Sequence, residues 1–423
     1  MNVQPIAELS PTERTALFDR SSGVEDAIQS AKEIIERVRT EGDVALRAYA
    51  REFDDCDVGN LEITDQTEAA TERLDPTLLA EIETAAENIR AFHEKQRPQD
   101  WRETTEGREL GRRFRPIERV GVYTPGGTAS YPSSALMGII PAVVAGVEHV
   151  GVVTPPAEQL DDATLAAIQI AGGDAVYQVG GAQAIAALAY GTETVSRVEK
   201  IVGPGNQFVT AAKQLVQGDV EIDFLAGPSE LVVVADETAN APFVAADLLA
   251  QAEHDPNASV VAVTHHEPTA ERIAKETERQ LEAIDRNDIA REALENDASG
   301  VFIARSRSEA VLFAESYAPE HLSIQTEDDE AILDRIDSAG SVFLGPYTPV
   351  AAGDYATGTN HVLPTSGGAR TTGGLAVETF LRSTTVQRLN KTALEDLRET
   401  ITTIATTEGL EAHARSVDQR FQP

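Results

Sequence analysis

The chain has 423 residues, and its 35 Lys and Arg against 70 Asp and Glu give a formal net charge of −35. This length suffices for roughly two or three domains with sizeable cores, and the 41% hydrophobic fraction indicates a folded protein. Because the acidic excess runs through the whole sequence, it would repel a polyphosphate backbone, and we expect no nucleic acid partner.

The composition also indicates a compartment. Lys occurs at only six positions, so the surface is acidic and poor in Lys, which suggests a protein that works at high salt. The single cysteine, Cys56, cannot form an internal disulfide and fits a reducing environment. The N-terminus has no signal pattern, and the longest apolar stretch, Ala135–Val147, is short and contains Pro141. We therefore expect a cytoplasmic protein without a membrane span.

Residues 1–118 are predicted to be a helical start that packs with the first α/β domain. Ser10-Pro11-Thr12-Glu13 has the pattern of a capping box with proline in the first turn. Apolar residues then recur at helical spacing over Val24–Val44 and Leu78–Phe92.

From Arg119 the pattern changes to short apolar runs that end in glycines and alternate with Ala- and Ile-rich stretches. This alternation is typical of parallel strands with crossover helices. It predicts a nucleotide-binding α/β domain over 119–230, whose strands start near Val120, Val150, Ala175 and Lys200.

A second such series predicts another α/β domain over 231–375, with strands near Leu231, Ser259, Val301 and Ser341. Periodicity alone leaves open whether the two series form separate sheets. Gly353–Leu375 is a long irregular segment, which is more often a functional loop than a linker. Residues 376–423 are predicted to be a helical arm. The fold class is thus α/β, with two Rossmann-like domains of mostly parallel sheets, a helical N-terminal segment and a helical C-terminal arm.

Three glycine-marked strand ends predict a nucleotide site, because ligands bind outside the carboxyl ends of strands in open α/β sheets. These are 123–127, 180–184 and 203–207. None matches the G-x-G-x-x-G fingerprint, so each could also be a plain turn.

The second half concentrates histidines and carboxylates. Gln251 and His254 are three residues apart at the end of a helical run, which places them on one face. Glu320 and His321 are adjacent, and both side chains can transfer protons near neutral pH. Taken alone, this pair and the pair of Gln251 and His254 could each be ordinary polar residues without a catalytic role. Together with Asp354, these residues offer oxygen and nitrogen ligands suited to Zn or Mn. The residues alone thus indicate a dehydrogenase or a metal-assisted hydrolase.

Several longer motifs, taken in order, resemble the histidinol dehydrogenase family. The resemblance runs from about Arg119 to Leu389, with a thinner match in the C-terminal arm. The matching segments are VGVYTPGG, GGAQAIAALAYGT, KIVGPGNQFVTAAK, DFLAGPSELVVVAD, LLAQAEHDP, APEHLSI, SVFLG and GDYATGTNHVLPT.

This resemblance implies a zinc enzyme that oxidises L-histidinol to L-histidine through histidinal, with reduction of two NAD, in the last step of histidine biosynthesis. It also implies a role for each matched residue. The catalytic acid and base are Glu320 and His321; the NAD contacts are Tyr123, Gln183 and Asn206; the zinc ligands are Gln251, His254, Asp354 and His413; the substrate contacts are Ser229, Gln251, His254, His321, Asp354, His361, Glu408 and His413.

The resemblance further implies a homodimer in which the C-terminal arm reaches the partner's site. Glu408 and His413, five residues apart, would then act across the interface. Two other readings stay open at this point: a zinc hydrolase in which Glu320 activates water, and a non-catalytic nucleotide-binding protein.

Overall fold

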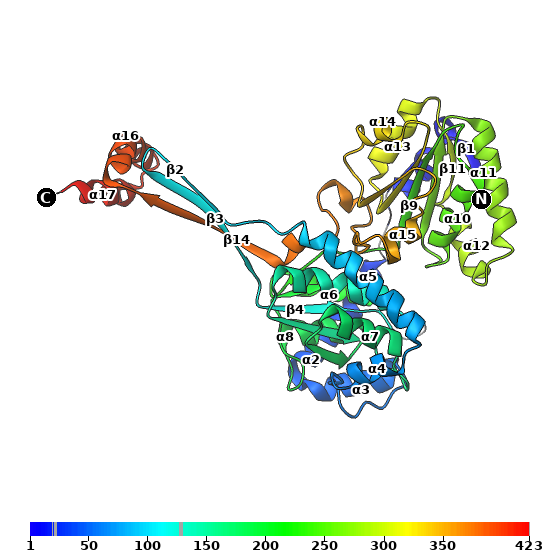
Figure 1. Ribbon diagram of the computed structural model, residues 1–423, viewed down its shortest axis with the longest axis horizontal. Coiled ribbons are helices and arrows are strands. Elements are labelled where there is room, and N and C mark those ends of the chain that lie inside the picture. Colours follow the sequence, from blue (N-terminus) through cyan, green and yellow to red (C-terminus); the bar gives the residue numbers. More distant parts are fainter. Residues whose placement is uncertain (19, 21–22, 127–129, 423) are drawn as a thin grey trace. The chain divides into compact units, whose positions relative to one another are not determined.

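A computed structural model describes residues 1–18, 20, 23–126 and 130–422 (Figure 1). The chain divides into two compact units. The first consists of Met1–Gln96 and Ile117–Phe380, and the second of Arg97–Pro116 and Leu381–Pro423.

The first unit begins with a short strand and a group of helices. The capping box is confirmed: the Ser10 N–H donates to Glu13 Oε2 at 2.7 Å, and the Glu13 N–H donates to Ser10 Oγ at 3.2 Å. The elements are β1 (Val3–Pro5), η1 (Ile6–Glu8), α1 (Pro11–Phe18), α2 (Val24–Glu41), α3 (Asp43–Phe53), α4 (Gln66–Arg73) and α5 (Pro76–Glu94).

The predicted helical stretch 24–44 is divided at Gly42. This residue has φ +55° and ψ −132°, a conformation that ends α2 and that L side chains rarely adopt. Glu193 lies where a Cβ on Gly42 would point, and its Oε2 accepts from the Asp43 N–H at 2.9 Å. The break between α2 and α3 is therefore held by the contact of Glu193 with the start of α3.

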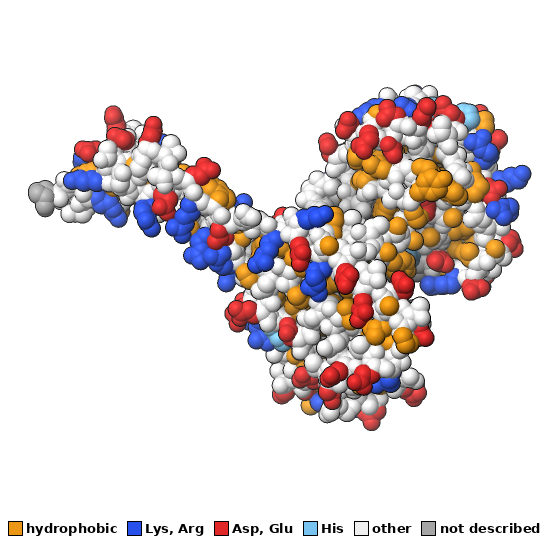
Figure 2. Space-filling view, in the orientation of Figure 1, with side chains coloured by type: hydrophobic (Ala, Val, Ile, Leu, Met, Phe, Trp, Pro, Cys, Tyr) orange, Lys and Arg blue, Asp and Glu red, His pale blue; other side chains and the backbone are white. Residues whose placement is uncertain are grey.

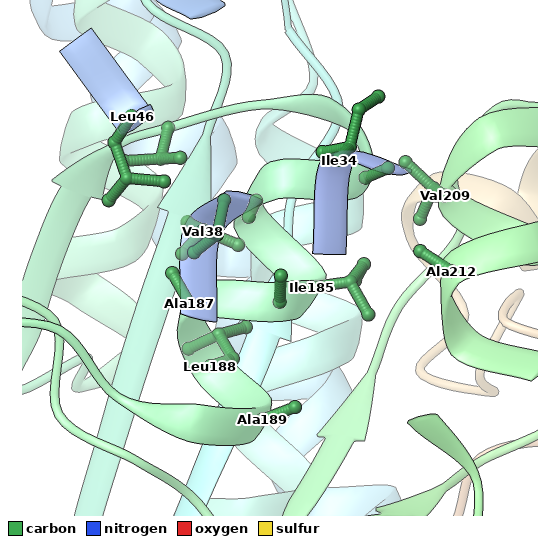
Figure 3. Packing of buried hydrophobic residues seen from close by; sticks show 14 of the residues in the cluster. Ile34, Val38, Leu46, Ile185, Ala187, Leu188, Ala189, Val209 and Ala212 are labelled. Atoms are coloured by element: carbon green, nitrogen blue, oxygen red, sulfur yellow. The ribbon is translucent and has the colours of Figure 1, made fainter. Parts of the chain in front are cut away.

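A five-stranded parallel sheet forms the first α/β half, in the order β6-β5-β4-β7-β8. Helices α2, α8 and α9 pack on one face through Ile34, Val38, Ile185, Leu188 and Val209 (Figure 3). The elements are β4 (Arg119–Tyr123), α6 (Pro132–Ala145), β5 (His149–Thr154), α7 (Asp162–Ala171), β6 (Ala175–Gln178), α8 (Gly181–Tyr190), β7 (Lys200–Val202), α9 (Gln207–Val216) and β8 (Glu221–Ile222).

A six-stranded parallel sheet forms the second α/β half, in the order β1-β11-β10-β9-β12-β13. Leu231 and Val233 of β9 face the cluster with α10, α11 and α12, whereas Val232 and Val234 face α1, α13 and α14 (Figure 1). The elements are β9 (Glu230–Ala235), α10 (Ala241–Ala252), β10 (Ser259–Thr264), α11 (Glu267–Leu281), α12 (Asn287–Glu295), β11 (Gly300–Ile303), α13 (Arg307–Tyr317), β12 (His321–Gln325), α14 (Asp329–Leu333), β13 (Ser341–Leu344), α15 (Val350–Tyr355), η2 (Gly368–Arg370) and η3 (Val377–Phe380).

Strand β12 was not predicted, although its five residues alternate polar with apolar side chains, which is a strand pattern; all five are buried. It nevertheless lies in the middle of the sheet, between β9 and β13. Both neighbouring strands were predicted, so the missing strand is the one that carries His321.

A buried amide joins the two α/β halves. Asn360 Nδ2, in the long segment after α15, donates to the Met137 carbonyl of α6 at 2.8 Å and lies 3.4 Å from His93 Nε2 of α5. Its Oδ1 accepts from the Val362 N–H at 2.9 Å. Residues more than two hundred positions apart are thereby fixed together in the interior.

The second unit is an antiparallel sheet with helices. The helices α16 and α17 agree with the expected helical arm, but the segment before them is a strand, and residues before Ile117 form a hairpin. Neither strand of the hairpin shows an alternating apolar pattern, and β2 is exposed along its whole length. The sheet order is β14-β3-β2, and the elements are β2 (Trp101–Thr105), β3 (Arg108–Pro116), β14 (Leu381–Leu389), α16 (Lys391–Thr407), α17 (Glu411–Asp418) and η4 (Gln419–Phe421).

Charge is distributed unevenly between the units. The second unit carries 12 Lys and Arg against 10 Asp and Glu and is slightly basic, so the whole acidic excess belongs to the first, which has 23 Lys and Arg against 60 Asp and Glu. Blue side chains gather along the strands of the second unit in Figure 2, and red ones are spread over the first.

The predicted fold class is confirmed: the protein is α/β with mostly parallel sheets, and both halves of the first unit have the strand order of doubly wound folds. Within the described residues, no helix combines the length and the apolar character that a membrane span requires.

The charge distribution predicts that the protein loses stability in dilute salt. At 0.01 M ionic strength the Debye length is about 30 Å, so the 60 carboxylates of the first unit repel one another across its whole surface. We expect the midpoint of thermal unfolding to fall by several degrees between molar and 0.01 M potassium chloride. A midpoint that stays constant across this dilution would contradict the argument.

Candidate active site

Glu320 and His321 lie at the amino edge of the second sheet. Glu320 precedes β12, His321 begins it, and both are buried, with exposed fractions of 6% and 4%. His321 Nδ1 lies 3.1 Å from the Glu230 carbonyl oxygen, which is an acceptor only, so Nδ1 carries the hydrogen. His321 Nε2 is buried and has no hydrogen-bond partner among the described residues. Nε2 is therefore the nitrogen at which the ring gains or loses its second proton.

The long segment after β13 brings Asp354 and His361 to this pair. Asp354 Oδ1 is 3.6 Å from His321 Nε2, and His361 Nδ1 donates to the Asp354 carbonyl oxygen at 2.9 Å. Four of the residues predicted to act on the substrate thus meet around the imidazole of His321. The segment that was expected to be functional for its length and irregularity supplies two of them.

Burial and charge act in opposite directions at this site. Burial lowers the pKa of His321, but the carboxylates of Glu320 and Asp354 outweigh it and raise this pKa to about 10. Burial raises the pKa of Asp354, and His321, His361 and His254 together hold it below its usual value. In this state the imidazolium and the Asp354 carboxylate stabilise each other.

Gln251 and His254 reach the same edge through the course of α10. This helix follows β9, crosses back along the sheet and ends at Ala252, so its last turn lies at the amino edge. Gln251 is buried there with 3% of its surface exposed, and His254 follows one turn later. Helix α10 packs against α15, which carries Asp354.

These residues fit a divalent cation by their donor chemistry. Gln251, His254 and Asp354 offer an amide oxygen, an imidazole nitrogen and a carboxylate, without thiolate. Across the described ranges, no group of three or more His, Cys, Asp or Glu is already arranged to hold a metal ion. One ligand of the predicted set is an amide, and another, His413, belongs to the second unit. The first unit therefore supplies three of the four predicted ligands.

Ser229 stands immediately before β9. Its carbonyl oxygen accepts from the Ser259 N–H at 2.9 Å, which fixes the backbone beside Glu230. Glu230 itself was not singled out from the sequence, although it ends the GPSE segment and contacts both members of the acid/base pair. The signal that could have found it is a carboxylate at the start of a fully apolar strand.

The predicted nucleotide residues meet at the carboxyl edge of the first sheet. Tyr123 ends β4 and is buried, which raises the pKa of its hydroxyl to about 12. This hydroxyl accepts from the Gly181 N–H at 3.1 Å, at the start of α8. Gln183 is buried in the first turn of the same helix. Two of the three glycine-marked loops therefore touch at the Tyr123 side chain.

The third loop follows β7, the strand beside β4 at the point where the strand order reverses. Gly203 has φ +109° and packs so closely on the Tyr123 backbone that a Cβ would collide with it. Asn206 caps α9 by accepting from the Phe208 and Val209 N–H groups at 3.0 and 3.2 Å. Gly127 of the first loop lies outside the described residues.

A cavity of about 670 Å³ opens beside this edge, after β5 and β6. Its lining includes Asp55, Cys56, Gln66, Glu158 and Gln178. Asp54, next to this lining, raises the pKa of Tyr123, so the cavity and the Tyr123 loop are neighbours.

Glu408 and His413 belong to the second unit, so the geometry above does not include them. Glu408 caps the end of α16, and His413 lies in the first turn of α17. Both side chains are exposed.

Comparisons with known proteins identify the family. A family model described as histidinol dehydrogenase matches residues 19–421. The chain belongs to the histidinol dehydrogenase family.

Curated histidinol dehydrogenases match this chain over its whole length. Those of Natronomonas pharaonis and Halobacterium salinarum are 68% and 67% identical over 421 and 423 residues, with 100% of both chains covered. That of Methanosarcina mazei is 48% identical over 426 residues, covering 100% of this chain and 98% of the relative. A crystal structure of histidinol dehydrogenase from Elizabethkingia anophelis superposes with a TM-score of 0.94 at 39% identity, covering 99% and 97% of the two chains.

The family membership confirms the main functional prediction. The protein is an NAD-dependent dehydrogenase that acts on histidinol in histidine biosynthesis. Relatives from halophilic organisms agree with the acidic, Lys-poor surface of a histidinol dehydrogenase adapted to salt.

Asp54 provides a test of the electrostatics near the Tyr123 loop. Burial raises its pKa to about 6, and its Oδ2 has no partner among the described residues. Because the folded protein binds this proton more tightly than the unfolded chain, the charged carboxylate costs stability above about pH 6, and the cost vanishes below about pH 4. Asp54→Asn should raise the free energy of unfolding by about 1 kcal/mol at pH 7.5, after allowance for partial exposure.

The measurement is denaturant unfolding without NAD at pH 7.5 and pH 4. Asp55→Asn, at the exposed neighbour, is the control and should change little at either pH. An equal gain for Asp54→Asn at both pH values would show that the effect is not the ionisation of this carboxyl.

Proposed function

We propose that the enzyme oxidises L-histidinol to L-histidine in two successive steps through histidinal, with two NAD and one zinc ion per subunit. The observation that carries the proposal is the buried imidazole of His321, whose unpartnered Nε2 faces Asp354 while Glu320 lies beside Nδ1. We also propose that the enzyme works in the cytoplasm at high salt.

In the first step His321 accepts the hydroxyl proton of histidinol at Nε2 as hydride leaves the carbon for NAD. The Nδ1–H bond to the Glu230 carbonyl fixes the ring orientation and the tautomer needed for this transfer. His321 can act as a base only when its imidazole is neutral. Because the Asp354 carboxylate stabilises the protonated ring, this carboxylate has to bind another group before His321 loses its proton.

In the second step Glu320 activates the water that hydrates the aldehyde, and the hydrate gives a second hydride to NAD. Overall, one histidinol, one water and two NAD are consumed. Glu320 Oε2 accepts from the Glu230 N–H at 2.8 Å, which leaves Oε1 for the water. Because both side chains are buried, bulk water is kept from the pair.

The proposed zinc ligands are Gln251, His254, Asp354 and His413. These residues would hold the ion, with the Asp354 carboxylate as one ligand, and bound zinc would supply orientation of the substrate and control of its charge. Ser229, His361 and Glu408 complete the proposed substrate contacts.

For the cofactor, we propose contacts from Tyr123, Gln183 and Asn206 at the carboxyl edge of the first sheet. The meeting of two of the three loops at Tyr123, and the close approach of Gly203 to it, support this assignment. The cavity lined by Asp55 and Gln178 offers room for the rest of the dinucleotide.

We further propose a homodimer in which the second unit is the exchanged arm. Its described residues include only four buried apolar side chains, Ala393, Ala405, Ala414 and Val417. Five large apolar side chains of the same unit are exposed: Trp101, Leu110, Leu389, Ile404 and Leu410. So small a core does not stabilise such a unit alone, and the exposed apolar surface is typical of one that packs on a partner.

The reaction is tested by counting NADH formed per histidinol consumed in high potassium chloride. We expect two NADH per substrate, loss of activity on chelation, and recovery when zinc is restored. Zinc-dependent hydrolysis of an ester or amide substrate, without NAD reduction on histidinol, would favour the zinc hydrolase. A folded, zinc-loaded protein that reduces no NAD would contradict the proposal.

Arm exchange is tested by mixing two inactive variants. His321→Asn should lower kcat by about 10²–10⁴-fold, and His413→Ala should lose zinc and activity. After joint unfolding and refolding, half of the dimers are hybrids. If arms act across the interface, each hybrid regains one intact site, so the mixture recovers about a quarter of the wild-type activity. No recovery would mean that His413 acts within its own subunit.

A further inference from the structure

We propose that Arg20 and Glu230 form a positioning pair that holds Glu320 and His321 in place for proton transfer. The proposal rests on the roles proposed above for Glu320 and His321. It gives a role in the reaction to a buried ion pair that touches no reacting atom.

Glu230 contacts both members of the acid/base pair with three of its groups. Its N–H donates to Glu320 Oε2 at 2.8 Å, and its carbonyl accepts from His321 Nδ1 at 3.1 Å. Its carboxylate Oε2 accepts from the Glu320 N–H at 3.3 Å. A shift of this one residue therefore moves the carboxylate and the imidazole together.

Arg20 fixes the other side of Glu230. Arg20 Nε and Nη2 donate to the two oxygens of the Glu230 carboxylate at 2.7 and 3.2 Å, a bidentate contact. The guanidinium lies 3.7 Å from the centre of the Tyr317 ring, and Nη2 also donates to the Tyr317 carbonyl at 3.1 Å. Its side chain is only 6% exposed, so the pair has one available geometry.

The charge of Arg20 is needed because two carboxylates are buried side by side. Burial raises the pKa of Glu230, the neighbouring Glu320 raises it further, and Arg20 opposes both. Without the Arg20 guanidinium, either Glu230 or Glu320 would become protonated, or the two carboxylates would move apart. Either change alters the hydrogen bonds that hold Glu320.

Glu230 also anchors the segment that supplies Asp354 and His361. Its Oε1 accepts from the Ser366 N–H at 2.7 Å, and Ser366 has φ +54°. The same carboxylate thus joins Arg20, which follows α1, to β9, to Glu320 at the start of β12 and to the long segment after α15. An ion pair that only stabilised the fold would not need all four connections to end at the reactive pair.

The test compares Glu230→Gln and Arg20→Lys with the wild type in the zinc-loaded enzyme. Glutamine keeps the volume and one acceptor, and lysine keeps the charge but not the bidentate contact. We expect kcat to fall about 10–100-fold, with KM for histidinol and NAD and the zinc content per subunit nearly unchanged. Arg20→Met should lose more than Arg20→Lys. An unchanged kcat per folded, zinc-loaded site, or an effect on KM alone, would overturn the proposal.

The double variant Arg20→Met/Glu230→Gln tests whether the two residues act as a pair. Its loss of kcat should be much smaller than the product of the single losses, because the second change removes a partner that is already lost. Losses that multiply would show that the residues act independently and would overturn the pairing.

Two control variants distinguish a failure of the proposed function from a failure of the positioning role. Asp43→Asn removes another buried carboxylate, one held by the Thr192 and Thr194 hydroxyls at 2.7 and 2.6 Å, and should lower stability without changing kcat. His321→Asn is measured in parallel. If it keeps full turnover, the proposed function fails; if it is inactive while the Glu230 and Arg20 variants are not, only the positioning role fails.

Discussion

The parallel pairing of β9 with β12, in which Leu231 lies opposite His321, determines where the reactive groups of this protein stand. In this register Glu320, which precedes β12, lies beside Glu230, the first residue of β9, and the backbone N–H of each donates to the carboxylate of the other. A slip of one residue would turn His321 to the opposite face of the sheet and separate it from Asp354. The fully buried, β-branched strand β9 holds this register because both of its faces are packed.

The candidate functional residues lie at the carboxyl edge of the first sheet but at the amino edge of the second. The glycine-marked loops lie at the carboxyl ends of β4 and β7, as expected for an open α/β sheet. In the second sheet the acid/base pair lies at the amino edge, and α10 delivers Gln251 and His254 there because a crossover helix ends where the next strand begins. The general rule for ligand sites in such sheets therefore predicts one half of this site and would misplace the other.

Much of this arrangement follows from local sequence. The predicted strands at Leu231, Ser259 and Ser341 are observed. The unbroken apolar runs of the first two are typical of strands buried on both faces, whereas the third is a partly buried edge strand. Glu320 and His321 are also found from local sequence, since they adjoin each other. The partnership of Arg20 with Glu230 spans 210 positions and has no local pattern, so only the folded chain reveals it. The strands of the second unit escape prediction for a different reason: their side chains are largely exposed, so no alternation marks them.

The Asn360 amide has a mechanical consequence. It bonds to the Met137 carbonyl of one half and to the Val362 N–H of the other, in a place that water does not reach. Hinge bending between the halves would leave the Asn360 Nδ2 and the Met137 carbonyl without each other in the interior, at a cost of about 1–3 kcal/mol for each group. Closure around the substrate by movement of two lobes is therefore energetically opposed in this protein. The half that carries the proposed acid/base pair and the half that carries the proposed dinucleotide loops are thus held together by a buried hydrogen bond before any substrate binds.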